Sequence, residues 1–177
     1  MKEAAENYSQ HFSLSELLVH ALVIELEAVQ SYKDLKEQME ECGNSDVAGL
    51  FEKMSKLEAE HAEKIREKAG DLALPKLAPW EFRWAGLEAP ENIDLAGVHY
   101  LMTPHQALTL ALENEMSAMA FFDAIAHDCT DKQVRSMAIE FADDERQHVS
   151  WMKEWLTKYP APDADWDHDP DPPAAID

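Results

Sequence analysis

Glycine and cysteine are both scarce in this sequence, whose 177 residues include only 5 Gly and 2 Cys. The two cysteines, Cys42 and Cys129, form no Cys-x-x-Cys pair, so neither a structural zinc site nor a four-cysteine iron site can be built from them alone. We expect two reduced thiols. Few glycines, together with many Ala, Leu, Met, Glu and Lys residues, favour helix over sheet, and the predicted fold class is all-α.

Basic side chains are scarce as well. There are 15 Lys and Arg against 36 Asp and Glu, which gives a formal net charge of −21. The field around such a molecule repels phosphate groups, so we expect no nucleic-acid partner and no membrane as a partner. The longest apolar run, 17–24, is interrupted by His20 and is too short to span a bilayer. Residues 1–6 lack the apolar stretch of a signal peptide, and we therefore expect a soluble, cytoplasmic protein.

Local start and stop signals predict four long helices. Ser13 and Glu16 form a capping box before the first helix, Thr130 and Gln133 form one before the fourth, and Pro160 ends the fourth. The helices are expected over about 13–41, 47–70, 103–128 and 130–159. The predicted division of the chain is an N-terminal extension (1–12), a helical bundle (13–159) and an acidic tail rich in Pro and Asp (160–177).

The segment 71–102 is far longer than a helical hairpin needs. It is rich in Pro, Trp and Leu, and we expect one long crossover between the second and third helices. The crossover has room for a short helix and for packing Trp80, Phe82 and Trp84 on the bundle. A single crossover gives the helix order up, down, down, up. The two cysteines, each just past a helix end, then lie at opposite ends of the bundle and cannot form a disulfide.

The two halves of the sequence repeat one pattern. Glu-x-x-Ala-x-x-x-aromatic occurs on the first and third predicted helices, and Glu-x-x-His occurs on the second and fourth. The first motif runs from Glu25 to Tyr32 and from Glu115 to Phe122, and the second from Glu58 to His61 and from Glu145 to His148. The repeat predicts two related helical hairpins in a bundle with pseudo-two-fold symmetry.

The repeated Glu and His residues lie on the apolar face of each predicted helix, which points to the bundle interior. Four carboxylates and two imidazoles therefore converge at one level of the core. Isolated buried carboxylates are costly and no Lys or Arg shares these faces, so a bound cation is the expected partner. A buried hydrogen-bonded network of the same groups is the alternative. The predicted metal ligands are Glu25, Glu58, His61, Glu115, Glu145 and His148.

Six ligands of this kind suit two metal ions with open coordination positions. Carboxylates and imidazoles together favour Fe or Mn, and Zn or Co could occupy the same site without a change of sequence. A Glu and a His three residues apart share one helical face, so each pair can serve the same metal region. Redox chemistry is the usual reason for such a site.

These residues resemble the rubrerythrin branch of the ferritin-like di-iron carboxylate proteins, over about 13–159. One Glu from each of two helices, plus Glu-x-x-His from each of the other two, is the known ligand pattern of such bundles. The resemblance implies a ferritin-like four-helix bundle in which the six residues bind two iron ions, with two Glu bridging, and in which the centre reacts with peroxide or dioxygen. It further implies a homodimer or a larger homo-oligomer.

The sequence departs from the family pattern in two places. Ala118 stands where some rubrerythrins carry a seventh carboxylate, and the four cysteines of a rubredoxin domain are missing. Electrons are then expected from an external donor. Phe122 replaces the second of two aromatic hydroxyls, whereas Tyr32 keeps the first, and we expect Tyr32 to donate a hydrogen bond close to the site.

Three classes of function remain open. The first is an oxidoreductase that reduces peroxide or dioxygen with electrons from an external donor. The second is a ferroxidase or iron-handling protein that takes Fe(II) as its substrate, and the third is a non-catalytic metal-binding bundle. A cation could bind weakly at 166–169 in the tail, although solvated disorder is the preferred interpretation there. The remaining acidic and His residues considered are expected to be solvated or to fill the core: Glu27, Glu60, Glu113, His20, His105 and His127.

Overall fold

The computed structural model of the protein describes residues 9–84, 89–90, 93 and 98–167. Four α-helices make up most of this part: α1 (Leu14–Glu41), α2 (Ser45–Ala69), α3 (Pro104–Asp128) and α4 (Lys132–Leu156). A short 3-10 helix, η1 (Pro79–Glu81), lies between α2 and α3. The described residues contain no β-strand, so the predicted all-α four-helix bundle is confirmed. None of the helices in this part of the chain has the length and apolar character needed to cross a membrane.

The helix starts follow local capping chemistry. At α1 the Glu16 N–H donates to Ser13 Oγ (3.2 Å), and the Ser13 N–H donates to the Glu16 carboxylate (2.8 Å). The capping box predicted at Thr130 is wrong. Asp131 caps α4 instead, because its carboxylate accepts hydrogen bonds from two N–H groups in the first turn, and the helix begins one residue later than the box implied.

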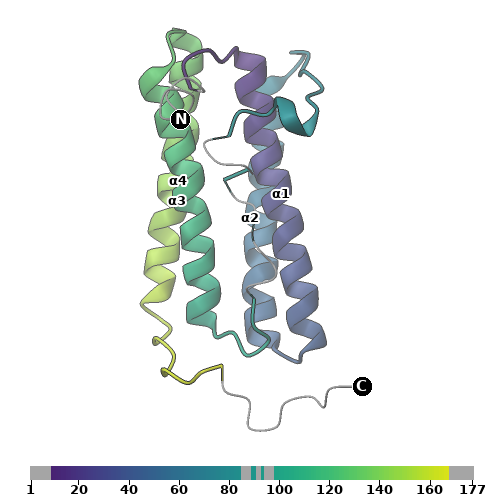
Figure 1. The fold of residues 1–177 in the computed structure, drawn as a ribbon, viewed down its shortest axis with the longest axis vertical. Coiled ribbons are helices and arrows are strands. Elements are labelled where there is room, and N and C mark those ends of the chain that lie inside the picture. Colours follow the sequence, from purple (N-terminus) through teal and green to yellow (C-terminus); the bar gives the residue numbers. More distant parts are fainter. Residues whose placement is uncertain (1–8, 85–88, 91–92, 94–97, 168–177) are drawn as a thin grey trace.

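The helix order is the predicted one. In the view of Figure 1, α1 runs downward, α2 returns upward, α3 again runs upward and α4 runs downward. Cys42 caps the end of α1 and Cys129 caps the end of α3, so the two residues lie at opposite ends of the bundle. Both are free thiols, as predicted.

The core consists of two apolar clusters, one toward each end of the bundle. The upper cluster, named for the view of Figure 1, includes Phe12, Ile24, Ile65, Ala118, Phe121, Phe122, Phe141 and Ala142. The lower cluster includes Ala28, Tyr32, Met39, Phe51, Met54, Leu108, Ala111 and Met152. On every helix the predicted Glu and His ligands lie between residues of the upper and lower clusters. The candidate site is therefore in the middle of the bundle, closed above and below by apolar side chains.

A buried histidine joins the crossover to the upper cluster. His20 Nε2 accepts the Arg83 N–H (3.0 Å), so its Nδ1 carries the proton and donates to Glu16 O (2.7 Å). Trp84 packs against the upper cluster, and Phe82 stacks on Trp84 with ring centroids 5.1 Å apart. Both aromatic residues pack as predicted, and His20 fills the core.

Trp80 does not pack as predicted. Its side chain is 85 % exposed, although the neighbouring aromatic residues of the crossover pack on the bundle. Trp80 is the middle residue of η1, a single tight turn fixed by a hydrogen bond from the Ala78 N–H to the Glu81 carboxylate (2.7 Å). Such a short turn can present only part of its side chains to the bundle, and Trp80 is on the side that faces solvent.

Candidate metal centre

All six predicted ligands meet between the two core clusters. Each is at most 7 % exposed. Their oxygen and nitrogen atoms form three overlapping groups, and within each group the ligand atoms lie within 4.8 Å of one another. The groups are Glu58, His61 and His148; Glu25, His61 and Glu145; and Glu115, Glu145 and His148. We call these six residues the Glu/His cluster.

The space for the cluster comes from small residues on α1 and α3. Glu25 lies between Ala21 and Ala28, which are one turn away on either side and fully buried. Glu115 has the same setting, since alanines at 111 and 118 are also fully buried. Because residues three and four apart share a helix face, these methyl groups flank each carboxylate and leave room beside it. The repeated Glu-x-x-Ala motif thus provides both a ligand and the space next to it.

The two imidazoles are in direct contact. His148 Nε2 lies 3.0 Å from His61 Nε2, and His148 Nδ1 lies 2.9 Å from a Glu115 oxygen. When Glu115 is ionised it accepts a hydrogen bond from the Nδ1–H of His148, which leaves Nε2 of that ring with its lone pair. His61 and His148 then point nitrogen atoms at the same point of the cluster.

Several carboxylate oxygens of the cluster are buried without a hydrogen-bond partner among the described residues. They are Glu25 Oε2, both oxygens of Glu58, and Glu145 Oε2. A buried polar atom left in this way costs about 1–3 kcal/mol, and more when it is charged. A cation bound among these oxygens and the imidazole nitrogens would remove that cost. The donor set therefore fits a metal that accepts mixed oxygen and nitrogen ligands.

In the absence of a cation the cluster favours protonated carboxyl groups. Burial, followed by the charges of neighbouring carboxylates, raises the pKa of Glu25, Glu115 and Glu145 well above the usual range. Burial also raises the pKa of Glu58, and His148 opposes that rise. Like charges in a space of low polarity cannot all ionise, and a bound cation would reverse this balance.

His61 is held in its neutral form. Burial lowers its pKa to about 3, and the charges of His148 and Lys64 act in the same direction. Neutral imidazole is the form that binds metals. The Lys64 ammonium lies 3.4 Å from His61 Nε2. The sequence-based interpretation missed this lysine, although a spacing of three residues on one helix indicates that the two side chains are neighbours.

The other candidate residues lie where their spacing implies. Tyr32 is buried in the lower cluster and stacks on Phe51, with ring centroids 6.0 Å apart. Its expected role as a hydrogen-bond donor to the site stays a prediction. Ala118 and Phe122 are buried in the upper cluster and bring no further carboxylate or hydroxyl to the site. Three glutamates expected to be solvated are exposed, namely Glu27, Glu60 and Glu113.

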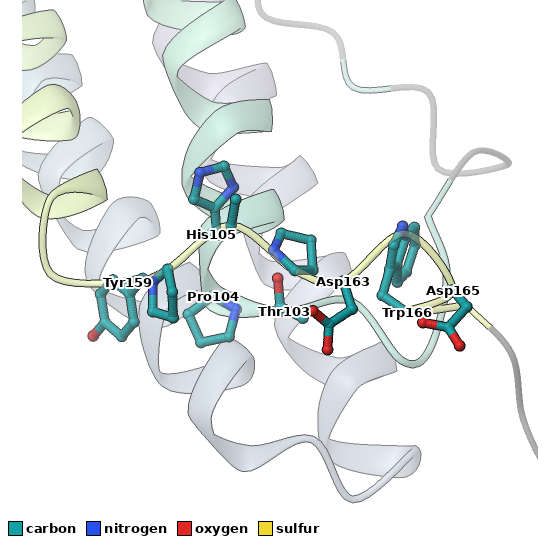
Figure 2. A pocket seen from close by; sticks show the side chains of 10 residues that line it. Thr103, Pro104, His105, Tyr159, Asp163, Asp165 and Trp166 are labelled. Carbon is teal, nitrogen blue, oxygen red and sulfur yellow. The ribbon is translucent and has the colours of Figure 1, made fainter.

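A surface concavity lies at the lower end of the bundle, away from the Glu/His cluster. Figure 2 shows it between the start of α3 and the tail, and its volume is about 740 Å³. Its polar lining includes His105, Asp163 and Asp165, but these residues form no metal-ligand group, since the only such groups in the described residues belong to the cluster. The weak cation site considered at 166–169 reaches residues 168 and 169, which lie outside the described part of the chain.

Comparisons with known proteins match the architecture. A family profile described as a ferritin-like domain matches residues 15–161. The crystal structure of an uncharacterized conserved protein from Magnetospirillum magnetotacticum is similar with a TM-score of 0.66 and 34 % sequence identity. That alignment covers 86 % of this chain and 99 % of the other. No curated protein sequence matches significantly.

Proposed function

The chain belongs to the ferritin-like family, and we propose that its Glu/His cluster binds two metal ions, with iron preferred over manganese or zinc. The observation that carries this proposal is the group of buried carboxylate oxygens without a hydrogen-bond partner among the described residues. No Lys or Arg in that part of the chain pairs with the four clustered glutamates. Metal cations would supply the missing positive charge.

We further propose that the protein is an oxidoreductase of the rubrerythrin type, which reduces peroxide or dioxygen. Iron would supply one-electron redox chemistry at each of two neighbouring positions, which amino-acid side chains lack. The residues of this chain enclose the site and orient the imidazole of His148. The upper and lower clusters close both ends of the site. When Glu115 is ionised, the Nδ1–H of His148 donates to it, and the Nε2 atom that faces His61 is then left without a proton.

The proposed reaction draws its electrons from another molecule. The two cysteines cap the ends of α1 and α3, which lie at opposite ends of the bundle, and they cannot together hold a rubredoxin-type iron. Ala118 is fully buried beside the cluster and offers no additional carboxylate. The step that consumes the oxidant and the step that restores electrons should therefore be separable in solution.

Mixing reduced, iron-loaded protein with peroxide tests this function. We expect one rapid oxidation, followed by no further reaction until a chemical reductant such as dithionite is added. Absorbance in the stopped flow and peroxide consumption measure the two phases. Protein that binds two iron ions but never oxidises with peroxide or oxygen would refute the oxidoreductase function and leave a non-catalytic metal-binding bundle.

An iron-handling function is the second candidate. The net charge of −21 attracts cations to the molecule, and Fe(II) would then be the substrate. Adding excess Fe(II) with oxygen distinguishes the two functions. A ferroxidase oxidises many Fe(II) ions per chain without another reductant, whereas the proposed peroxidase oxidises only the two ions that it holds.

A further inference from the structure

A groove on the surface of the bundle runs beside the Glu/His cluster. It is formed by residues of α2 and α4 and has a volume of about 480 Å³. The lining residues are Lys53, Lys56, Leu57, Glu60, Trp151 and Trp155. The lining thus combines three apolar side chains with three charged ones, and a groove of this size with apolar walls and a few polar groups is typical of a small-molecule site.

The indole of Trp151 connects this groove with the cluster. It stacks on the imidazole of His148, with ring centroids 5.3 Å apart and an angle of 28° between the planes. His148 in turn contacts His61 and Glu115. A single aromatic ring therefore separates a molecule in the groove from one of the proposed metal ligands.

The groove has an inner end close to the cluster and an outer end farther away. His61 on α2 contacts His148 on α4, and the two helices run in opposite directions (Figure 1). The distance of each lining residue from the cluster therefore follows from the number of residues between it and His61 or His148 on its own helix. At 1.5 Å per residue the two ends are about 10 Å apart. The inner end holds Leu57, Glu60 and Trp151, and the outer end holds Lys53, Lys56 and Trp155.

The two ends differ in charge. Lys53 and Lys56 bring two ammonium groups to the outer end in a chain whose net charge is −21. Lys56 pairs with Glu52 (2.8 Å), whereas Lys53 forms no ion pair with any described residue. Glu60 brings a hydrogen-bond acceptor to the inner end. The complementary ligand is a planar aromatic molecule with a donor on its ring edge and an anionic group at its other end.

We propose that this groove binds free flavin mononucleotide, with the flavin ring against Trp151 and the phosphate at Lys53 and Lys56. The ring is planar and carries an N–H that can donate a hydrogen bond to the Glu60 carboxylate. The ribityl chain extends toward the outer end, where the lysines pair with the phosphate. Both indoles of the groove then contact the ligand.

Flavin bound in this position can be the external electron donor. Oxidation of fully reduced flavin releases two electrons and two protons, and reduction of peroxide to two molecules of water consumes the same number of each. This role as the entry point for electrons rests on the proposed function. The binding of flavin mononucleotide does not, because the groove is outside the Glu/His cluster.

Equilibrium dialysis of the metal-free, full-length protein with oxidised flavin mononucleotide tests the binding. We expect one flavin per chain, and roughly tenfold weaker retention of riboflavin, which lacks the phosphate that the lysines recognise. Lys53→Glu, at an exposed position, should weaken flavin mononucleotide binding to about the level of riboflavin. Trp155→Leu should weaken the binding of both ligands, and its melting curve shows whether the fold is kept.

Trp80→Leu is the matched control, because Trp80 is the most exposed large apolar residue described and lies outside the groove. It should leave the retention of flavin unchanged. Absence of binding at millimolar flavin, or binding that Lys53→Glu and Trp155→Leu both leave intact, would overturn the proposal.

Anaerobic reduction of the oxidised, iron-loaded protein separates this inference from the proposed function. Reduced flavin mononucleotide should restore the reduced centre, and Lys53→Glu should slow that step roughly tenfold while dithionite reduces both proteins alike. If dithionite restores reactivity with peroxide and reduced flavin does not, the flavin role is wrong and the proposed function stands. If flavin binds as expected but the iron-loaded protein never reacts with peroxide, the proposed function is wrong and the binding site stands.

Discussion

The two halves of the bundle carry the same ligands in different surroundings. In the α3 and α4 half, His148 is 1 % exposed and its Nδ1 contacts Glu115. In the α1 and α2 half, His61 is 7 % exposed and contacts Lys64, while Glu25 Oε2 has no partner among the described residues. The repeated motif determines which atoms meet, and the neighbours of each half determine how firmly those atoms are held.

This difference makes the α3 and α4 half the more pre-organised one. The contact between Glu115 and His148 holds both side chains before any cation binds, whereas Glu25 Oε2 has no hydrogen-bond partner among the described residues and Glu25 adjoins other carboxyl groups. We expect two ions bound with unequal affinity, and the variants below are chosen to break or sharpen this asymmetry.

The largest expected effect is the loss of metal from Glu115→Ala. This change removes a ligand and also the partner of His148, so the affinity should fall by more than the roughly 10–100-fold typical of lost supporting contacts. Glu25→Ala removes a ligand only and should lose less. Metal content after dialysis against a chelator measures both. Equal losses in the two variants would show that the halves are equivalent.

Glu113→Ala is the control for that comparison. Glu113 is exposed and faces about 200° away from Glu115 on the helix, so its removal should leave the metal content unchanged. If Glu113→Ala loses as much metal as Glu115→Ala, the assignment of the inward face of α3 is wrong.

The second effect concerns the stability of the metal-free protein at different pH values. The folded-state pKa of Glu25 lies well above the unfolded value of about 4.5, so its stabilising contribution is complete below pH 4.5 and is lost as the pH rises. Glu25→Gln cannot ionise and escapes this loss. The variant should gain stability relative to the original protein by up to about 1.4 kcal/mol per pH unit until the folded pKa is reached.

Urea denaturation of both metal-free proteins between pH 6.5 and 8.5 measures this difference, with Glu113→Gln as the exposed control. His61 acts in the opposite direction, because its folded pKa of about 3 lies below the usual 6.5 and its contribution is lost as the pH falls from 6.5 toward 3. Working above pH 6.5 keeps the two effects apart. A difference between Glu25→Gln and the original protein that does not depend on pH would contradict the raised pKa.

A third, smaller effect comes from the hydrogen bond that fastens the crossover to the first half. His20 accepts the Arg83 N–H, and the position that corresponds to it in the repeat of the second half is Leu110. His20→Leu should lower the free energy of unfolding by about 1–3 kcal/mol, because the Arg83 N–H loses its acceptor. Thermal and urea unfolding measure this. His127→Leu, at an exposed histidine, should change the stability by less than about 0.5 kcal/mol.

The smallest expected effect is on the pKa of His61. Burial is the main cause of its low value of about 3, and Lys64 is the last of the causes. Lys64→Met should therefore raise the pKa of His61 only slightly, which NMR titration of the ring protons can follow in metal-free protein. A return of this pKa to the usual 6.5 would mean that the lysine and not burial controls the ring, and that the two halves differ mainly by this charge.

The sequence predicted the helices and the convergence of the ligands because both depend on regular spacing. Glu58 and His61 are three residues apart on an apolar face, and the same pattern returns on α4, so the helical period places them in the core. Features without a period were missed. The outward position of Trp80 depends on a single turn in the crossover. The stacking of Trp151 on His148 is different, because the two residues are three apart on α4 and this spacing makes them neighbours.

The cap of α4 is another feature that no regular spacing predicts, and the structure places Asp131 there and not Thr130. Both residue types are good caps, and competition between adjacent candidates is decided by the path of the preceding turn. Lys64 is different, because its spacing from His61 was visible. The sequence analysis placed no Lys or Arg on the inward faces, but the long, flexible side chain of Lys64 reaches His61 from beside that face.

The protonated carboxyl groups of the cluster give the metal-free protein the character of an ion exchanger. Each cation that enters has to displace acidic hydrogens, so loading releases acid into the solution in proportion to the metal taken up. Because apolar side chains close the site along the bundle axis, we expect this exchange to occur through the side of the molecule. Uptake of metal by this protein thus exchanges protons for a cation, and it becomes more favourable as the surroundings become more alkaline.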